Sequence, residues 1–98
     1  MAIDDKQVLE VSKTLRALSH PLRLKIIAFI DKQKETNVNQ IYSGLKIEQS
    51  ITSQQLKILR DASLVFSKKV GKVVFYSLNY QKIATISKVL KKFQSKLG

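Results

Sequence analysis

The apolar residues of this chain change their spacing once, and that change limits the folds it can adopt. They recur with the 3.6-residue period of an α-helix along most of the chain, but between Leu64 and Leu78 side chains alternate with a period of two. Gly71 divides this stretch into two runs, which is typical of a β-hairpin that turns at the glycine. The sequence therefore predicts a mainly α protein with about five helices and one two-stranded hairpin.

The first, second and last helices can be placed from their apolar spacing and their end signals. The range 5–18 carries one apolar stripe. The second helix begins at Pro21, where proline loses no hydrogen bond, and Ser19 or His20 caps it. Apolar side chains surround much of this helix, so we expect it to be the most buried one. The last helix covers 80–97, with apolar residues on one face and lysines opposite.

The third and fourth helices are separated by a very short connection. Asn37, with Gln40 three residues later, resembles a capping box that opens the third helix. A turn from Gly44 to Ile47 then leads into the stretch 48–60. Two helices joined so tightly, the second with a polar outer face, predict a helix-turn-helix.

The stretch 48–60 has two different faces when its residues are stepped at about 100° each. One arc is apolar and is expected inside: Ile51, Thr52, Leu56, Ile58, Leu59 and Ala62. The other arc carries amides, hydroxyls and then cations: Gln49, Ser50, Ser53, Gln54, Lys57 and Arg60. Amides and hydroxyls can read base edges in the major groove, and lysine can hold phosphates. The alternative is an ordinary half-buried helix with a polar face. We predict base reading by Gln49, Ser50, Ser53 and Gln54, and phosphate binding by Lys57.

Three lysines lie near the turn of the predicted hairpin: Lys68, Lys69 and Lys72. A lysine cluster at such a place often only protects an edge strand from pairing. Directly after a helix-turn-helix, it is better interpreted as a wing that lies along a phosphate backbone. The predicted architecture is thus a winged helix-turn-helix, with phosphate binding by these lysines.

The charge of the chain favours a polyanionic partner. Eighteen cations and seven acids give a net charge of +11. Residues 1–45 carry seven cations and five acids, whereas residues 46–98 carry eleven cations and two acids. Nucleic acid is the first partner that such a field suits, and an anionic membrane is the second.

The composition excludes several classes of protein. With 98 residues the chain is expected to form one domain, 1–98. It has no cysteine, so disulfides, thiolate metal sites and cysteine nucleophiles are excluded. His20 is the only histidine, and we interpret it as a structural cap rather than a pH sensor or ligand. No carboxylate pair or phosphate-cradling glycine loop is present, so the protein is predicted not to be an enzyme.

No membrane segment or signal peptide is predicted. The chain has no apolar run of roughly 18 residues, and its acidic start M-A-I-D-D is unlike a signal peptide. We therefore expect a soluble, cytoplasmic protein without membrane partners.

Two apolar stripes, one on each terminal helix, exceed what a small winged core can cover. A basic amphipathic helix such as 80–97 could lie on a membrane, but a homodimer that pairs 5–18 with 80–97 accounts for both stripes. The predicted dimer interface comprises Val8, Val11, Leu15, Ile83, Ile86, Leu90 and Phe93.

Three motifs resemble the ArsR-type winged-helix repressors: A-L-S-H-P-L-R-L-K-I-I (17–27), S-x-x-L-K-I-L-R-D-A-S-L-V (53–65) and V-G-K-V-V-F-Y-S-L (70–78). The resemblance covers nearly all of the chain. It implies a dimeric transcriptional repressor that an effector releases from operator DNA, with a dimer built mainly from the first and last helices.

The chain departs from the family pattern in and after the predicted recognition helix. The family's two histidines fall on Gln54 and Gln55. Gln54 lies on the polar arc and can pair with adenine, whereas Gln55 projects onto the apolar arc and is expected to be a buried or half-buried hydrogen-bonding residue. Ser63 replaces the usual glycine, and we expect it to tighten or distort the entry to the wing.

The metal ligands of the family are also missing. Its C-x-C positions are Asn37 and Asn39 here, and neutral amides are poor ligands for soft or borderline ions. The last helix lacks the Asp, His and Glu of the family's other site. We predict no metal, no cofactor and no metal response, and the residues identify no effector.

Two other functions remain compatible with these residues. The first is a loosely specific architectural nucleic-acid-binding protein of the same fold. The second is a protein-interaction module that binds an acidic partner through the lysines of 80–97.

Overall fold

The computed structural model describes residues 5–97, with side chains described up to Lys91. These residues form α1 (Asp5–Leu18), α2 (Pro21–Gln33), β1 (Thr36–Asn37), α3 (Val38–Leu45), α4 (Gln49–Asp61), β2 (Val65–Val70), β3 (Val73–Leu78) and α5 (Tyr80–Leu97). The predicted fold class, mainly α with a winged helix-turn-helix, is confirmed.

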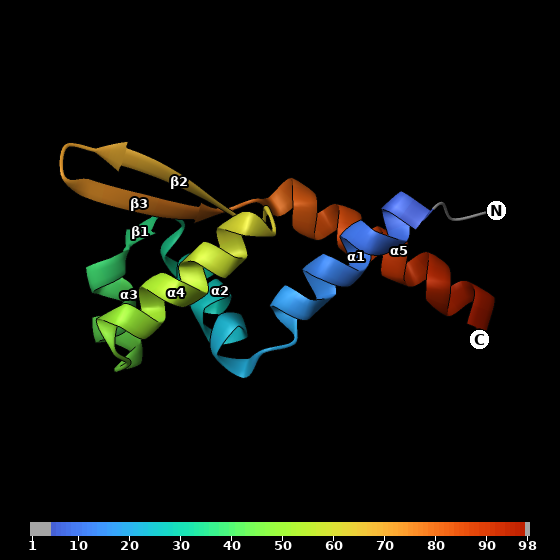
Figure 1. The fold of residues 1–98 in the computed structure, drawn as a ribbon, viewed down its shortest axis with the longest axis horizontal. Coiled ribbons are helices and arrows are strands. Elements are labelled where there is room, and N and C mark those ends of the chain that lie inside the picture. Colours follow the sequence, from blue (N-terminus) through green and yellow to red (C-terminus); the bar gives the residue numbers. More distant parts are fainter. Residues whose placement is uncertain (1–4, 98) are drawn as a thin grey trace.

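The molecule is elongated, measuring 47 × 25 × 21 Å. Figure 1 shows α2, α3 and α4 gathered in one half, with the β2–β3 hairpin projecting from it, while α1 and α5 reach into the other half. The helix-turn-helix and the hairpin therefore lie together, apart from most of the two terminal helices.

Helix α2 is central, as its apolar content predicts. It contacts α1, α3, α4 and β3, and its Ile26 and Ile30 are completely buried. Leu24 is an exception to the predicted burial, because it is 49% exposed on the outer side of the helix. The core around α2 consists of Ala17, Ile26, Ile30, Ile41, Leu56, Leu59, Ala62, Leu64, Val65 and Leu78.

A short strand that the sequence did not predict extends the hairpin to a three-stranded sheet of order β1-β3-β2. In β1, Thr36 pairs with Tyr76 and Asn37 with Phe75. Two residues are too few to produce a periodic pattern, so the strand is defined only by its pairing with β3.

The predicted capping box at the start of α3 is half formed. The Asn37 side chain accepts the backbone N–H of Gln40 at 2.9 Å, as expected for an N-cap. The Gln40 side chain does not accept the backbone N–H of Asn37, as a full capping box requires. Its Oε1 instead accepts a hydrogen bond from the hydroxyl of buried Thr36 at 2.7 Å. The interaction that would complete the box is thus replaced by a link to β1.

The hairpin is anchored in the core at one end only. Its register runs from Val65↔Leu78 to Val70↔Val73, and only the first of these two pairs is buried. The turn lies at Gly71, which has φ +63, as predicted. The alternation of side chains does not create an inner and an outer face along the whole hairpin, because its tip extends beyond the helices that could cover it.

Helix α4 ends in a regular pattern of backbone hydrogen bonds, although Ser63 stands where the family usually has glycine. Ser63 has a left-handed φ of 61°, its N–H donates to the Arg60 carbonyl, and the Leu64 N–H donates to the Leu59 carbonyl. These two bonds form a Schellman motif, in which glycine is preferred at the Ser63 position. The expectation that Ser63 distorts the entry to the wing is therefore wrong.

Candidate nucleic-acid interface

Six polar side chains of α4 point away from the core. They are the members of the predicted polar arc, and all are exposed: Gln49, Ser50, Ser53, Gln54, Lys57 and Arg60. None of them makes a side-chain hydrogen bond or ion pair with any other described residue. Their donors and acceptors therefore remain available to an external partner.

The opposite face of α4 is buried more narrowly than predicted. Thr52, Leu56 and Leu59 are buried in the core. The Thr52 hydroxyl donates a hydrogen bond to the Glu48 carbonyl at 2.9 Å. Ile51 and Ile58 were expected inside, but each is 37% exposed. They lie at the edge of the apolar arc, where the neighbouring helices no longer cover α4.

Gln55 is half-buried and hydrogen-bonded, as predicted, and its partner is Arg23. The Arg23 Nη1 donates to Gln55 Oε1 at 2.9 Å, while its Nε and Nη2 donate to the Ala17 and Arg16 carbonyls at 2.6 and 3.1 Å. One guanidinium thus joins the C-terminal end of α1 to α4. Sequence reasoning missed this role of Arg23, because its partners lie six, seven and 32 positions away.

The two helices of the helix-turn-helix are connected by Lys46 to Glu48, a turn that begins two residues later than predicted. Helix α3 continues to Leu45, and Lys46 adopts the left-handed conformation that ends it. Gly44 allows α3 to approach α2 closely, since a Cβ at this position would lie 2.5 Å from Cε2 of Phe29.

His20 caps α2, as predicted. Its Nδ1 accepts the backbone N–H of Leu22 at 3.2 Å, and Pro21 follows it at the first helical position.

The lysines of the hairpin are all exposed, but they do not share one face. Lys68 and Lys69 are consecutive in β2 and therefore point to opposite sides of the sheet. Lys72 follows Gly71 in the turn. The three charges surround the tip of the hairpin instead of forming one row.

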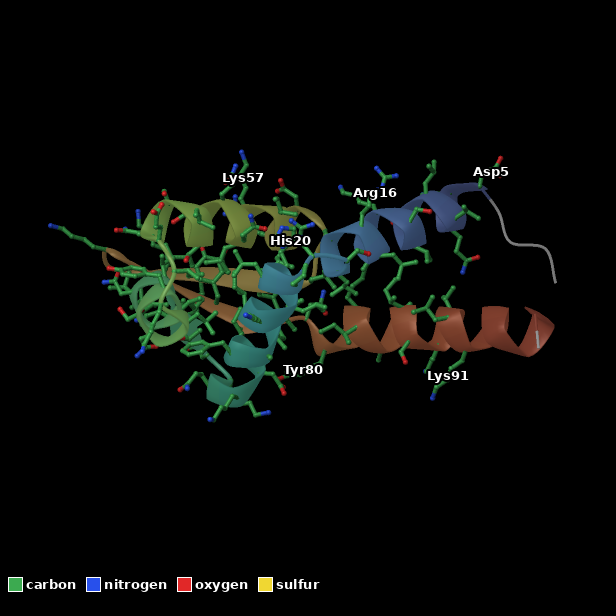
Figure 2. All side chains as sticks on the ribbon, turned by 90° about the horizontal axis from the view of Figure 1, so that it is seen from below. Asp5, Arg16, His20, Lys57, Tyr80 and Lys91 are labelled. Carbon is green, nitrogen blue, oxygen red and sulfur yellow. The ribbon has the colours of Figure 1, made fainter. Side chains whose placement is uncertain are left out.

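The apolar stripes of α1 and α5 partly cover each other within one chain. Val11 and Ile86, two residues of the predicted dimer interface, are already buried within the single chain. In Figure 2, side chains of both helices point into the space between them. Leu15 and Ile83 are half-buried, Val8 and Leu90 are exposed, and Phe93 lies outside the described side chains. The unpredicted Leu9 is the most exposed large apolar residue described, at 70%.

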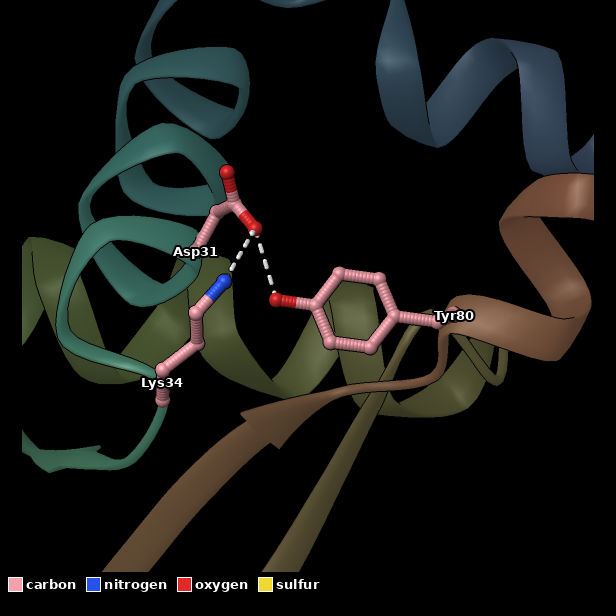
Figure 3. Close-up of polar contacts among 3 residues, drawn as sticks. All are labelled: Asp31, Lys34 and Tyr80. Carbon is pink, nitrogen blue, oxygen red and sulfur yellow. Dashed lines mark hydrogen bonds and ion pairs between the residues drawn. The ribbon is translucent and has the colours of Figure 1, made fainter.

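An exposed polar cluster connects the end of α2 with the start of α5 (Figure 3). The Tyr80 hydroxyl donates to Asp31 Oδ1 at 2.6 Å, and Lys34 Nζ lies 3.6 Å from the same oxygen. The hydrogen bond from Tyr80, followed by the charge of Lys34, lowers the pKa of Asp31 from its ordinary value. The same bond raises the pKa of the Tyr80 hydroxyl.

Asn79 forms a second connection to α5. Its Oδ1 accepts the Lys82 N–H at 3.1 Å and so caps the helix, while its Nδ2 donates to the Ser63 carbonyl at 2.9 Å. The start of α5 is thereby tied to the end of α4.

The positions that carry metal ligands in the ArsR-type repressors do not form a metal site in this chain. Asn37 caps α3, and Asn39 is an exposed neighbour. No group of three or more His, Cys, Asp or Glu side chains that could hold a metal ion occurs among the described residues. The described helices also include none that is long and apolar enough to cross a membrane.

Comparison with known proteins yields one consistent family. The model of the bacterial regulatory protein, arsR family, matches residues 20–67, from the cap of α2 into β2. The chain is 37% identical over 83 residues to the transcriptional repressor PagR of Bacillus anthracis, which covers 85% of this chain and 83% of PagR. It is 35% identical over 86 residues to the biofilm growth-associated repressor of Agrobacterium fabrum, covering 88% of this chain and 73% of that relative.

The similarity extends to three dimensions. The crystal structure of PagR matches this structure with a TM-score of 0.75 and 33% sequence identity, covering 89% of this chain and 99% of that chain.

Proposed function

Because the chain belongs to the ArsR family of bacterial regulatory proteins, we propose that it is a transcriptional repressor that binds operator DNA sequence-specifically as a homodimer. Membership of this family of regulators also identifies it as a protein that is not an enzyme. The observation that carries the proposal is the exposed face of α4, where amides and hydroxyls have no partner among the described residues.

In this proposal α4 is the recognition helix. Gln49, Ser50, Ser53 and Gln54 read base edges in the major groove, and an amide such as that of Gln54 is suited to adenine N6 and N7. Because these side chains are uncharged, they suit hydrogen bonding to base edges better than electrostatic attraction to phosphates. Phosphate binding falls to Lys57 on α4 and to the hairpin lysines Lys68, Lys69 and Lys72, which reach the backbone on either side of the tip.

The proposed dimer pairs α1 and α5 of one subunit with those of its partner. Val8, Leu9 and Leu90 are exposed there, and Leu15 and Ile83 are only half-buried. The extension of both helices away from the DNA-binding half supports this arrangement, since two recognition helices could then lie in successive major grooves (Figure 1). The whole chain, 1–98, acts as one winged-helix domain in the cytoplasm.

Release from DNA does not depend on metal in this proposal. The asparagines at the start of α3 and the lysines of α5 are poor metal ligands. We expect zinc, cadmium, arsenite and nickel to leave operator affinity unchanged. A stoichiometric metal that alters this affinity would contradict the proposal.

The decisive experiment is the selection of bound fragments from random duplex DNA. A repressor of this kind should select two related half-sites about one helical turn apart, because a symmetric dimer presents two recognition helices. The selected operator should then withstand competition by scrambled duplex. If no sequence is enriched and scrambled DNA competes equally, the protein is a loosely specific architectural binder of the same fold.

A further inference from the structure

A hollow of about 340 Å³ lies between α1, α2 and α4, on the flank of the exposed face of α4. Three of its lining residues are apolar, one is an acid and three are cations. They are Ala17, Ile58, Ala62, Asp61, Lys13, Arg16 and Arg23. None of the three cations belongs to the proposed base-reading or phosphate-binding set.

The cations of the hollow have no carboxylate partner among residues 5–91, whose side chains the structure describes. Within the described part of the chain, the pair of Asp31 and Lys34 is the only ion pair, so Asp61 neutralises none of them. Arg23 is half-buried and uses three of its five N–H donors on the Arg16 and Ala17 carbonyls and on Gln55. A partly buried guanidinium without a counter-anion is a strong donor for an oxyanion.

Arg16, one of the lining residues of the hollow, lies on the side of the molecule on which α4 presents Lys57 (Figure 2). In Figure 2, Arg16 and Lys57 point to the same side of the molecule, whereas Lys91 points to the opposite side. An anion held at this place would contact α1 and α4 together. It would lie beside the Arg23 bonds that set the position of α4 relative to α1.

We propose that the hollow is an oxyanion-binding site formed by Lys13, Arg16 and Arg23. The oxyanion is either a phosphate of the operator or the carboxylate of a small apolar acid, whose carbon part would rest on Ala17, Ile58 and Ala62. Asp61 limits the site to anions that approach from the α1 side. The phosphate source rests on the proposed function, whereas binding of a small acid requires no DNA.

The test compares the double variant Lys13→Gln/Arg16→Gln with Lys91→Gln, which removes a cation from the opposite side. Arg23 is left unchanged because it holds α1 and α4 together. The first arm measures operator affinity against salt, since each phosphate contact contributes about 0.9 to the slope of log affinity against log salt. The second arm adds sodium benzoate, or uncharged benzamide, to the free protein and follows the backbone amide resonances of Ile58, Asp61 and Ala62.

A slope that falls by about one per subunit in the double variant, but not in Lys91→Gln, assigns the site to DNA phosphate. Resonances shifted by benzoate and not by benzamide, with the shift lost in the double variant, assign it to a small acid. If neither occurs, the site is refuted. Failure of the proposed function can be told apart from failure of the oxyanion site. If the proposed function is wrong, the unchanged protein shows no preference for any operator, and the benzoate experiment alone tests the site.

Discussion

At the scale of single residues, the structure separates two glutamines that are adjacent in the chain. Gln54 is exposed without a protein partner, whereas Gln55 is half-buried and accepts a hydrogen bond from Arg23. A helix turns by about 100° between neighbours, so the two side chains face different surroundings. Gln54 is therefore the one of the two that we propose to meet a base edge, whereas Gln55 helps to hold the helix against α2.

We predict that Gln54→Ala lowers the preference for the operator over a scrambled duplex by roughly 1–3 kcal/mol per half-site, because one base contact is lost. The salt dependence should remain nearly the same. Lys72→Ala is the matched control, which should weaken both duplexes alike and lower the salt slope by about one per engaged subunit. Salt titrations of both variants on the two duplexes measure this. An unchanged preference in Gln54→Ala would show that α4 does not read bases through this residue.

Ser63 stores backbone strain, because a residue with a Cβ adopts a left-handed φ of 61° there. We predict that Ser63→Gly raises the free energy of unfolding by about 0.5–1 kcal/mol, since relief of the strain outweighs the added flexibility of the unfolded chain. Urea denaturation measures the change. Ser67→Gly, in the extended strand β2, should instead lower stability, and a gain in both variants would contradict this explanation.

At the scale of elements, α5 is held to the winged half of the molecule by Asn79 and Tyr80 at its start. Asn79 bonds the end of α4 through Ser63, and Tyr80 bonds the end of α2 through Asp31. Both contacts lie where the proposed dimer helix leaves the winged core. They define the angle at which that helix departs.

We predict that Tyr80→Phe raises the pKa of Asp31 toward its ordinary value, because the hydrogen bond from the hydroxyl is the main cause of the lowering. A carboxylate with a lowered folded-state pKa stabilises the protein above its unfolded pKa, and this contribution is lost as pH falls through the folded pKa. The stability difference between wild type and Tyr80→Phe should therefore be present at neutral pH and disappear below about pH 4.

Carbon-detected titration of the Asp31 carboxylate, together with urea denaturation at neutral and acidic pH, measures both effects. Lys34→Gln serves as the control and should raise the pKa of Asp31 less, since the charge of Lys34 is the second cause of the lowering. An unchanged Asp31 pKa in Tyr80→Phe would show that the bond is not formed in solution.

At the scale of the whole molecule, the exposed apolar residues of α1 and α5 lie in a different half from the exposed polar face of α4. Val8, Leu9 and Leu90 lie on the two extended helices, whereas the polar face of α4 lies at the other end with the hairpin (Figure 1). Such a separation allows one half to bind a second subunit while the other binds DNA. Val11 of α1 and Ile86 of α5 are buried within the chain, so both helices can contribute to one interface.

We predict that Leu90→Glu weakens the dimer roughly a hundredfold or more, because each subunit would bring an unpaired carboxylate into an apolar contact. Sedimentation equilibrium measures the dissociation constant. Lys91→Glu is the control, since that side chain is exposed and outside the proposed stripe. Operator affinity should fall with dimerisation in Leu90→Glu. A dimer of unchanged affinity in this variant would place the interface elsewhere.

The sequence by itself determined the helices, the hairpin turn at Gly71, the caps at His20 and Asn37, and the polar face of α4. These features depend on side chains within a few residues of one another, where helical and strand periods and capping hydrogen bonds leave a local pattern. The exposed state of Gln54 and the half-buried state of Gln55 follow from the same periodicity.

Only the tertiary structure decided the features that join distant parts of the chain. Pairing of β1 with β3 brings together residues about forty positions apart, the Arg23–Gln55 bond spans 32 positions and the Asp31–Tyr80 bond spans 49. Likewise, Ile58 is exposed and Val11 is buried because of which neighbouring helices reach them. The local periodicity of the sequence does not predict these contacts, because their free energy depends on how whole helices and strands pack.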